Sequence, residues 1–233
     1  MTLSLVKLKS YPILQQLQLE EALLRTDARS FCLINEGSNP AIVMGISSKP
    51  EEVIFLEKAR AKNIPIIRRY SGGGCVIVDE NTLFVTFILS KKIVSFSSYP
   101  ENILRWSEEF YQKAFQHAQF SLKENDYVLK NRKCGGNAQY ITKDRFVHHT
   151  SFLWDFKVEN MQLLKHPPKM PLYRQNRPHE QFITAMKEDF INIHSLIKGM
   201  KAELQNRFVV EEIELKDLLP LQHNPHRISV CTL

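Results

Sequence analysis

The first part of the chain alternates between helical and extended hydrophobic periods. Apolar positions over residues 12–25 recur at three- and four-residue intervals and predict a helix. Two short apolar runs follow at 31–34 and 41–44, and the glycine- and proline-containing turn between them predicts two strands joined by that turn. The helical period returns over 50–62, after a proline suited to a first helical turn. Residues 64–69 then predict a strand that ends at a run of glycines.

The middle of the chain is rich in strand-forming residues around one long helix. Residues 75–78 and 83–89 are apolar and β-branched, with a polar turn between them, and they predict a buried hairpin. Residues 101–119 give the clearest helical pattern, with aromatic and aliphatic side chains on one broad face. From 127 to 156 the pattern again indicates strands, interrupted by a polar turn at 142–145.

The last third begins with a segment rich in proline and basic residues. This segment, 164–178, includes the pair Pro167-Pro168 and predicts an ordered loop on the surface. Helical patterning resumes over 179–207 and is compatible with a break near Asp189.

The order of the predicted elements indicates an α+β fold. Residues 209–215 alternate like a last strand, so helices are mixed throughout with antiparallel-looking strand pairs. This order favours a central mixed or antiparallel sheet flanked by helices over a doubly wound fold. The 233 residues are 43% hydrophobic and 24% charged, as in an ordinary soluble domain, and we expect a single domain over 1–233.

The formal net charge of +6 is compatible with nucleic acid, an acidic protein or an anionic substrate as a partner. No Lys/Arg-rich run or basic–aromatic repeat is present, so we expect no nucleic-acid partner. No stretch approaches the ~18 apolar residues of a membrane span, and the first residues lack the apolar core of a leader. We therefore expect no membrane partner and a cytoplasmic location. Free thiols are expected at Cys32, Cys75, Cys134 and Cys231.

Most of the chain's 8 glycines fall in two segments. The first segment reads Arg68-Arg69-Tyr70-Ser71-Gly72-Gly73-Gly74 and follows a predicted strand. Consecutive glycines leave backbone N–H groups uncovered, which suits phosphate or carboxylate oxygens. A turn needing positive φ explains one or two glycines, but three of them after two arginines favour a ligand loop. The spacing matches neither the nucleotide P-loop nor the dinucleotide motif.

Lys133 precedes the second glycine segment, Cys134-Gly135-Gly136. A lone lysine is usually a solvated surface charge. Its three donors on one point charge would also allow it to bridge a carboxylate and a phosphate. The residue pattern leaves both interpretations open. Cys75 and Cys134 lie inside the two segments, but small apolar packing beside glycine explains them as well as reactivity does. We expect neither to be a nucleophile, so Cys→Ser variants should retain activity.

His148 and His149 are adjacent in a strand pattern, so their side chains face opposite sides and only one can face a shared site. The alternative is one exposed histidine and one hydrogen-bonded in the core. Further ligands at zinc spacing are lacking, and no metal site is predicted. Asp79 and the pair Asn125-Asp126 offer oxygen ligands for Mg²⁺, although turn capping explains each of them alone.

Together these segments resemble the lipoate-protein ligase family of the biotin/lipoate ligase superfamily. Residues 68–74 match the family's Arg-Arg-x-Ser-Gly-Gly-Gly stretch. Asn125-Asp126 and residues 132–138 match its Asn-Asp and Arg-Lys-x-x-Gly-x-Ala stretches. The paired histidines follow at the family's distance, and residues 40–45 resemble its early pocket-lining strand.

This resemblance covers about residues 10–156 and implies a biotin/lipoate-ligase-like catalytic domain with an acyl tunnel. It implies that Lys133 is the catalytic residue at the junction of carboxyl and phosphate groups. The residues that it places around the lipoyl group are Arg69, Ser71, Gly72, Gly73, Gly74 and His149. Those that it places around the nucleotide are Gly74, Cys75, Val76, Ile77, Asn125 and Asp126.

The implied reaction joins lipoate to the lysine of a lipoyl acceptor domain through lipoyl-adenylate. ATP with Mg²⁺ would activate lipoate, and fixed N–H groups, Lys133 and Mg²⁺ would stabilise the charge on phosphate and carbonyl oxygens. Acceptors would be the lipoyl domains of 2-oxo acid dehydrogenase E2 subunits or the glycine-cleavage H protein. An acidic acceptor would complement the charge of +6.

Three departures from the family pattern bear on this implied activity. Val78 stands where the family usually has histidine, and Thr150-Ser151 replaces a glycine-threonine pair. The end at Leu233 leaves little room for the small accessory domain of full-length bacterial ligases. A separate accessory subunit, or a pre-activated acyl donor, is therefore expected.

Other functions remain open from the sequence. An octanoyl- or lipoyl-transferase would use a cysteine thioester, but residues 125–127 lack the cysteine that some ligase-like transferases carry there. Biotin ligase is less favoured, because its glycine- and arginine-rich loop is absent. A non-catalytic module that binds lipoyl-adenylate is the third alternative.

Overall fold

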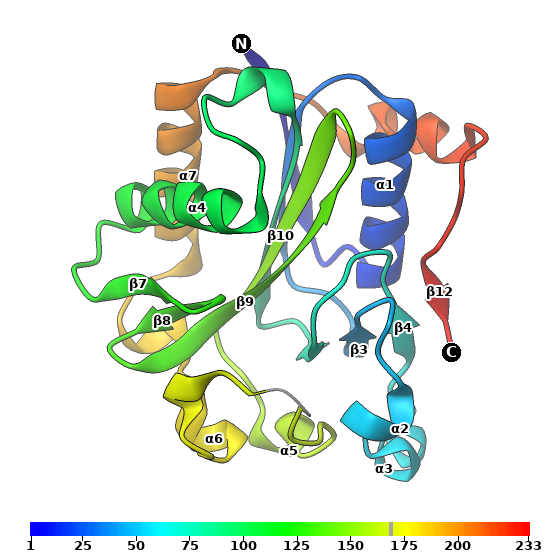
Figure 1. Cartoon of the computed structure of the whole chain (residues 1–233), viewed down its shortest axis with the longest axis vertical. Helices are drawn as coiled ribbons and strands as arrows, with labels where there is room; N and C mark the ends of the chain where they lie inside the picture. The colour runs from blue at the N-terminus through cyan, green and yellow to red at the C-terminus, as the bar shows by residue number, and fades with distance from the viewer. Residues whose placement is uncertain (168–169) are drawn as a thin grey trace.

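The computed structural model describes residues 1–167 and 170–233, and its backbone forms two sheets with helices around them (Figure 1). The larger, eight-stranded sheet runs in the order β11 (Val209–Glu212), β1 (Thr2–Lys9), β2 (Phe31–Glu36), β6 (Thr82–Ser90), β10 (Arg145–Leu153), β9 (Arg132–Ile141), β8 (Asp126–Leu129) and β7 (Phe120–Lys123). Strand β1 is parallel to β2 and β11, and the other neighbours are antiparallel. The predicted α+β fold with a mixed sheet is therefore confirmed.

A smaller sheet of four strands carries the glycine segment. Its order is β12 (Cys231–Thr232), β4 (Ile66–Arg68), β3 (Ala41–Met44) and β5 (Cys75–Val78). Strands β3 and β4 are parallel, and the other pairs are antiparallel. Because β4 ends at Arg68 and β5 begins at Cys75, the whole glycine run lies in the loop between two strands of this sheet.

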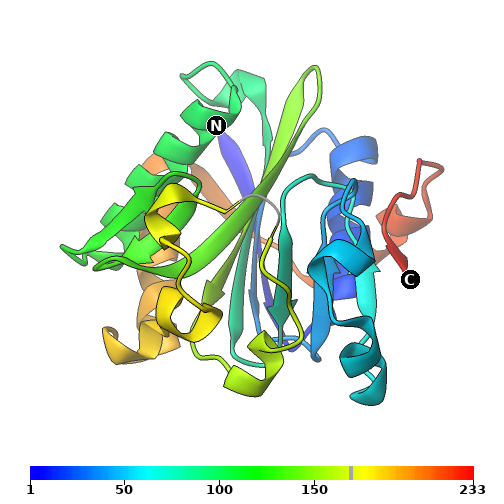
Figure 2. The same ribbon diagram turned by 60° about the horizontal axis from the view of Figure 1, so that its bottom comes forward.

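Helices cover both faces of the large sheet (Figure 1). The longer helices are α1 (Ile13–Thr26), α4 (Pro100–Phe115) and α7 (Ile193–Arg207). Helices α4 and α7 pack on one face and α1 on the other. Short helices α2 (Pro50–Val53), α3 (Leu56–Ala61), α5 (Val158–Met161) and α6 (His179–Phe182) lie at one end of the molecule, which Figure 2 turns towards the viewer.

Local sequence explains the limits of the long helices. Helix α4 starts with Pro100, whose missing N–H would be unpaired there in any case, and ends where Gln116 adopts the left-handed conformation (φ 51°). Helix α7 starts after Asn192, whose side-chain oxygen accepts a hydrogen bond from the Ser195 N–H at 2.8 Å. The described residues contain no helix long and apolar enough to cross a membrane.

The predicted hairpin of 75–78 with 83–89 is wrong in its pairing, although both strands form. Strand β5 pairs with β3 in the small sheet, and β6 pairs with β2 and β10 in the large one. The strands at 31–34 and 41–44 divide between the sheets in the same way. The β2–β3 and β5–β6 connections lie side by side. Gly37 adopts φ +80°, and a Cβ on it would lie 2.8 Å from the carbonyl oxygen of Glu80. The two connections thus pass each other in close backbone contact as the chain moves between the sheets.

Three further predictions need correction. The helix expected over 50–62 is interrupted after Val53, where Ile54 makes an isolated bridge with Leu164 and leaves two short helices. The pattern over 179–207 contains α6, a 3₁₀ turn at Met186–Glu188 and α7, so the break spans more than the region near Asp189.

The segment 164–178 is not wholly a surface loop, because Tyr173 and Arg174 are buried. Of the Pro167-Pro168 pair, Pro168 lies outside the described residues.

Three hydrophobic clusters of described residues fill the interior. The first lies between the large sheet, α4 and α7, and the second lies between the large sheet, α1 and the small sheet. The third packs the other face of the small sheet against α2, α3, α5 and α6. The glycine loop therefore belongs to the small sheet, whereas Lys133 belongs to β9 of the large one. How these sheets are packed decides whether the two motifs meet.

Candidate functional site

The glycine loop lies against the backbone that follows β3. The N–H of Gly45 donates to the Gly74 carbonyl at 3.2 Å, and the N–H of Ile46 donates to the Ser71 carbonyl at 3.0 Å. A Cβ on Gly45 would lie 2.2 Å from the Gly73 oxygen, so only glycine allows this approach. Gly73 itself has φ +94°, and Gly73 and Gly74 are exposed. The loop thus presents bare backbone to solvent while its base is fixed.

The Arg69 side chain holds this loop from below. Its Nε donates to Ser71 Oγ at 3.0 Å, and its Nη2 donates to the carbonyls of Gly72 at 2.6 Å and Gly74 at 3.0 Å. Only 5% of the residue is exposed, and burial lowers the pKa of the guanidinium to about 10. The loop carbonyls therefore turn inward to a buried cation, which places positive charge directly beneath the exposed glycines.

Ser71 continues this contact into the sheet. Its Oγ lies 2.8 Å from Nε2 of His149 on β10, and Nδ1 of His149 lies 3.1 Å from Oε2 of Glu20 on α1. His149 and Glu20 are both shielded from solvent, with side-chain exposures of 13% and 0%. Two of the residues predicted around the lipoyl group, Ser71 and His149, are thus in direct contact. Glu20 was not predicted.

His148 lies on the opposite face of the same strand, as the alternation requires. Its Nε2 contacts the hydroxyl of Tyr127 at 2.9 Å, and the residue is fully buried on the side of α4. Burial lowers the pKa of His148 to about 3. The interpretation of one exposed and one buried histidine is wrong for His149, which is held between Ser71 and Glu20.

A β-bulge sets the direction of Lys133. Tyr127 of β8 pairs with Gly135 of β9, but the next residue, Val128, pairs with Lys133, so β9 has one extra residue. Residues 133 and 136 would face opposite sides of a regular strand, and the extra residue returns them to the same side. A Cβ on Gly136 would lie 3.3 Å from both Cε and Nζ of Lys133. The Lys133 side chain therefore lies over Gly136.

Asp126 and Tyr173 fix the end of the Lys133 side chain. Nζ of Lys133 lies 2.7 Å from Oδ1 of Asp126, and the Tyr173 hydroxyl donates to Oδ2 of Asp126 at 2.9 Å. Burial raises the pKa of Tyr173, and the neighbouring Asp126 carboxylate raises it further. Tyr173 therefore keeps its proton and ties the 164–178 segment to the lysine. No sequence pattern pointed to Tyr173.

The two motifs meet on β9. A Cβ on Gly73 would lie 3.7 Å from Cβ of Ala138 and 3.9 Å from the Asn137 oxygen. Gly136 and Ala138 face the same side of the strand, roughly 7 Å apart. The ammonium of Lys133 and the exposed glycine loop therefore lie over neighbouring positions of one strand face.

The residues predicted around the nucleotide divide into two groups. Asn125 is exposed, its carbonyl accepts from Nδ2 of Asn137 at 2.7 Å, and it lines a surface cleft of about 420 Å³ beside the start of α4. Asn125 and Asp126 are thus close to Lys133 and to the glycine loop. Cys75, Val76 and Ile77 lie in the small sheet, and Ile77 is buried in the third hydrophobic cluster.

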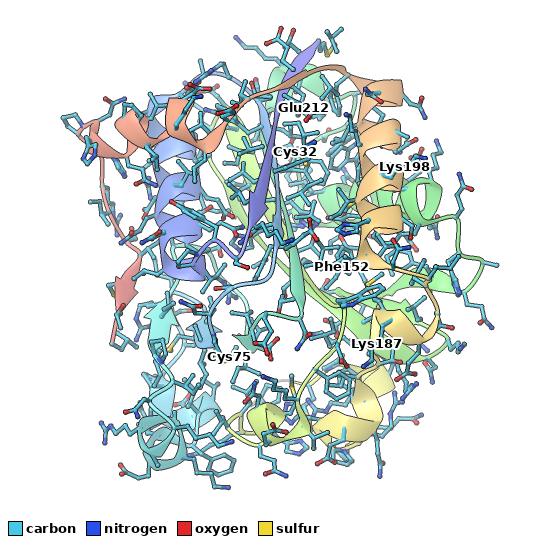
Figure 3. The ribbon with its side chains drawn as sticks, turned by 180° about the vertical axis from the view of Figure 1, so that it is seen from behind. Cys32, Cys75, Phe152, Lys187, Lys198 and Glu212 are labelled. Carbon is cyan, nitrogen blue, oxygen red and sulfur yellow. The ribbon has the colours of Figure 1, made fainter. Side chains whose placement is uncertain are left out.

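The remaining candidates have structural surroundings. Burial raises the pKa of Cys75 to about 12, and it also raises the pKa of Cys134, whose thiol donates to the Tyr127 carbonyl. Figure 3 shows Cys75 on the small sheet and Cys32 on the large one. Asp79 accepts hydrogen bonds from the Asn81 N–H at 2.9 Å and from Asn160 at 3.1 Å, as a turn residue does. Across residues 1–167 and 170–233, no group of three or more His, Cys, Asp or Glu could hold a metal ion.

Comparison with known proteins gives consistent matches. The sequence model of a family described as "Lipoyl protein ligase A/B catalytic domain" matches residues 12–208. A protein of Plasmodium falciparum named "Inactive lipoate–protein ligase 2" is 29% identical over 225 residues, covering 78% of this chain. The chain spans 58% of that relative's length.

Two solved structures share the fold. The bi-partite lipoate protein ligase of Thermoplasma acidophilum, described together with its E2 lipoyl domain, aligns with a TM-score of 0.77, 17% identity and coverage of 95% of this chain and 91% of that one. A lipoate-protein ligase A bound with ATP aligns with a TM-score of 0.73, 17% identity and coverage of 94% and 91%.

Proposed function

Because the chain belongs to the lipoyl protein ligase A/B catalytic-domain family, we propose that it is a ligase that attaches lipoate to a protein lysine through lipoyl-adenylate. The observation that carries this proposal is the meeting of Lys133 and the glycine loop on one face of β9. Arg69 beneath the loop adds a second positive charge, and among the described residues no carboxylate forms an ion pair with Arg69. A buried cation of this kind favours an anionic ligand nearby.

The proposed activation step is attack of the lipoate carboxylate on the α-phosphate of ATP, with pyrophosphate leaving. Negative charge then gathers on the phosphate and carbonyl oxygens of the mixed anhydride. The exposed N–H groups of Gly73 and Gly74 and the ammonium of Lys133 would stabilise this charge without reorganising. Mg²⁺ would enter with ATP as part of the substrate. The ligand oxygens would replace Asp126 as partners of Lys133.

In the proposed transfer step, a neutral lysine amine of the acceptor attacks the carbonyl carbon, AMP leaves with the bonding electron pair, and the amine nitrogen releases one proton to water as the amide forms. Lys133 would polarise the carbonyl, and its cation would stabilise the leaving phosphate. The proposed roles of Ser71 and His149 are to position the loop around the lipoyl group. Asn125 and Asp126 would meet the nucleotide from the β8 side. Ile77 faces the core, so of the β5 residues only the backbone and Cys75–Val76 would be available to the nucleotide.

The proposed acceptor is a lipoyl domain. Support comes from the T. acidophilum ligase of the same fold, which is described as bi-partite and as having an E2 lipoyl domain. By the same support we propose that residues 1–233 form one catalytic domain that acts with a separate accessory subunit. An E2 lipoyl domain and a glycine-cleavage H protein are the two acceptors to compare.

A second candidate function is a non-catalytic module that binds lipoyl-adenylate. The observation that favours it is the name of the P. falciparum relative, which describes an inactive ligase. This chain retains Lys133, Arg69 and three consecutive loop glycines, and these features favour the active alternative.

The decisive experiment measures the mass of an E2 lipoyl domain after incubation with the protein, lipoate and ATP·Mg²⁺, with and without an accessory subunit. Lys133→Ala should lower the rate by about 10²–10³-fold, because a preorganised charge of this kind stabilises the transition state by several kcal/mol. Lys130→Ala is the matched control, because Lys130 is exposed on the same β8–β9 turn and pairs with Asp189. Equal rates for Lys133→Ala and wild type would refute the ligase proposal.

Two further incubations separate the alternatives. Modification with an octanoyl- or lipoyl-carrier donor but not with lipoate and ATP identifies a transferase. Tight binding of a non-hydrolysable lipoyl-adenylate analogue, with no modification from either donor, identifies the non-catalytic module.

A further inference from the structure

Glu20 is a buried carboxylate that neither the sequence motifs nor the proposed reaction uses. It lies on α1 with 0% exposure, and four side chains contact its two oxygens. Gln16 Nε2 lies 2.8 Å and Thr86 Oγ1 2.7 Å from Oε1. The hydroxyl of Tyr70 at 3.4 Å and Nδ1 of His149 at 3.1 Å face Oε2. A carboxylate placed among so many donors is satisfied as an anion.

The direction of each hydrogen bond around Glu20 follows from its neighbours. Asn35 Nδ2 donates to Gln16 Oε1 at 2.8 Å, so the other end of the Gln16 amide is its NH₂ group, which donates to Glu20. Thr86 and Tyr70 also donate their hydroxyl protons. His149 must then present Nδ1–H to Glu20.

The same reasoning extends to the glycine loop. In a neutral imidazole with Nδ1–H, Nε2 carries a lone pair and accepts the Ser71 hydroxyl proton across 2.8 Å. The Ser71 oxygen in turn accepts Nε–H of Arg69 at 3.0 Å. Each group therefore donates a hydrogen bond to the next, from Arg69 to Ser71, from Ser71 to His149 and from His149 to Glu20. This chain of bonds joins the loop to α1 and β10.

We propose that Glu20 is a positioning residue of this site, which selects the Nδ1–H tautomer of His149 and thereby fixes Ser71 and the glycine loop. The consequence for catalysis rests on the proposed function, whereas the tautomer and the loop order do not. Without an acceptor at Glu20, His149 loses the group that orients it. The loop then loses the Ser71 contact that holds it against β10.

The discriminating variant is Glu20→Gln, which keeps size and shape. If the new NH₂ group faced Gln16 and Thr86, three donors would meet without an acceptor. The oxygen of the glutamine therefore stays on that side, and its NH₂ group faces His149. His149 must then accept at Nδ1 and carry its proton on Nε2, where it donates to Ser71. NMR of ¹⁵N-histidine-labelled protein should show the Nδ1 and Nε2 shifts of His149 exchanged, with the signals assigned by His149→Asn.

Glu21→Gln is the matched control. Glu21 is the next residue of α1 and is equally buried, but it pairs with Arg25 and accepts from the N–H groups of Ser229 and Val230. The His149 tautomer should stay unchanged in this variant. Ser71→Ala keeps the experiment decisive if Glu20→Gln does not fold, because it leaves α1 intact and moves the Nε2 shift of His149. It should also speed amide exchange at Gly45 and Ile46, whose N–H groups donate to the loop carbonyls of Gly74 and Ser71.

Amide exchange at Gly45 and Ile46 should become about tenfold faster in Ser71→Ala, as expected when a loop contact is lost. The change should be smaller in Glu20→Gln, where Nε2–H of His149 still donates to Ser71. With an active protein, kcat/KM for the acid should fall about 10- to 100-fold, mainly through KM, as for residues that orient a binding group. Glu20→Gln and Ser71→Ala should be non-additive, since they interrupt one chain of bonds.

An unchanged His149 tautomer in Glu20→Gln, or unchanged amide exchange at Gly45 and Ile46 in Ser71→Ala, would overturn the proposal. A wild-type protein that modifies no acceptor would instead refute the ligase proposal, and the two NMR results would still decide the role of Glu20.

Discussion

Two adjacent glycines on β9 separate a packing requirement from a chemical one. A Cβ on Gly135 would lie 2.6 Å from the ring of Phe152, which is fully buried (Figure 3). A Cβ on Gly136 would lie 3.3 Å from the flexible end of Lys133. A packed ring cannot move without disturbing its neighbours, whereas a lysine end can turn aside. Gly135 therefore serves the core, and Gly136 serves the placement of Lys133.

Gly136→Ala should leave stability nearly unchanged but lower acceptor modification about 10- to 100-fold, because a displacement of under about 1 Å at a reacting group has effects of this size. Gly135→Ala should instead affect stability, and it should lower the free energy of unfolding by about 1–3 kcal/mol through overpacking. Urea denaturation and the rate of acceptor modification measure the two effects. Full activity in a folded Gly136→Ala variant would show that the lysine needs no such contact.

The buried His148 predicts how stability depends on pH. Burial lowers its pKa in the folded protein to about 3, from 6.5 for the free side chain. Between these values the unfolded chain binds a proton that the folded one does not, so stability falls as pH falls, by up to about 1.4 kcal/mol per pH unit. His148→Gln keeps an amide that can hydrogen-bond to the Tyr127 hydroxyl but does not titrate.

Urea unfolding between about pH 7.5 and about pH 4.5 should therefore give a flatter acid limb for His148→Gln than for wild type. The control is His194→Gln at a histidine whose side chain is 74% exposed, and it should leave the limb in place. Identical slopes for His148→Gln and wild type would contradict a neutral, buried His148.

Residue-level prediction from the sequence depended on motifs and missed residues whose contacts come from the fold. The local pattern left Lys133 open between a surface charge and a ligand contact, and only the family resemblance implied that it is catalytic. Its position near the loop on β9 supports that role, which stays a prediction. Glu20 falls within the helix predicted over 12–25, and no local pattern indicates its burial, which arises from contacts with Gln16 of α1, with β6 and β10, and with the loop. The orientation of Lys133 could not be predicted either, because regular strand alternation would place Lys133 and Gly136 on opposite faces, and the bulge reverses this.

At the scale of elements, the hydrophobic pattern located strands better than it paired them. All four segments at 31–34, 41–44, 75–78 and 83–89 form strands, yet each short connection passes between sheets. A run of apolar residues records burial but not the partner strand. The two connections meet in a close backbone contact between Gly37 and Glu80, which joins residues distant in sequence.

Helices α4 and α7 cross at another glycine. A Cβ on Gly199 of α7 would lie 2.0 Å from the carbonyl oxygen of Ala114 on α4. Alanine is the better helix former by about 1 kcal/mol, but the two helices would have to separate. Because the clash outweighs the gain in helix propensity, we expect Gly199→Ala to lower the free energy of unfolding by about 1–3 kcal/mol.

Lys198→Ala, at an exposed position of the same helix, should change the free energy of unfolding by less than about 0.5 kcal/mol. Figure 3 shows Lys198 on α7. Chemical denaturation measures both variants, and a Gly199→Ala protein more stable than wild type would show that helix propensity outweighs the crossing.

For the molecule as a whole, the C-terminal segment connects the site to α1. The N–H groups of Ser229 and Val230 donate to Oε2 of Glu21 at 2.8 and 3.2 Å, and β12 then pairs with β4. Strand β4 leads directly into the glycine loop. The segment also covers the edge of β4, which would otherwise present unpaired backbone groups. Adjacent residues of α1 thus hold the loop from two directions, Glu20 through His149 and Glu21 through this segment.

If this segment belongs to the same cooperative unit as the two sheets, then a cavity within it must destabilise the entire protein. Val230 is 3% exposed and packs in the second hydrophobic cluster, so Val230→Ala should lower the global free energy of unfolding by about 1–3 kcal/mol. Ile228, 65% exposed, gives the control variant Ile228→Ala, with little expected change. Fluorescence and circular dichroism should follow one shifted transition. A Val230→Ala protein with an unshifted global midpoint but faster amide exchange in β12 would mean that the segment opens independently, and the loop would then depend on Glu20 alone for its attachment to α1.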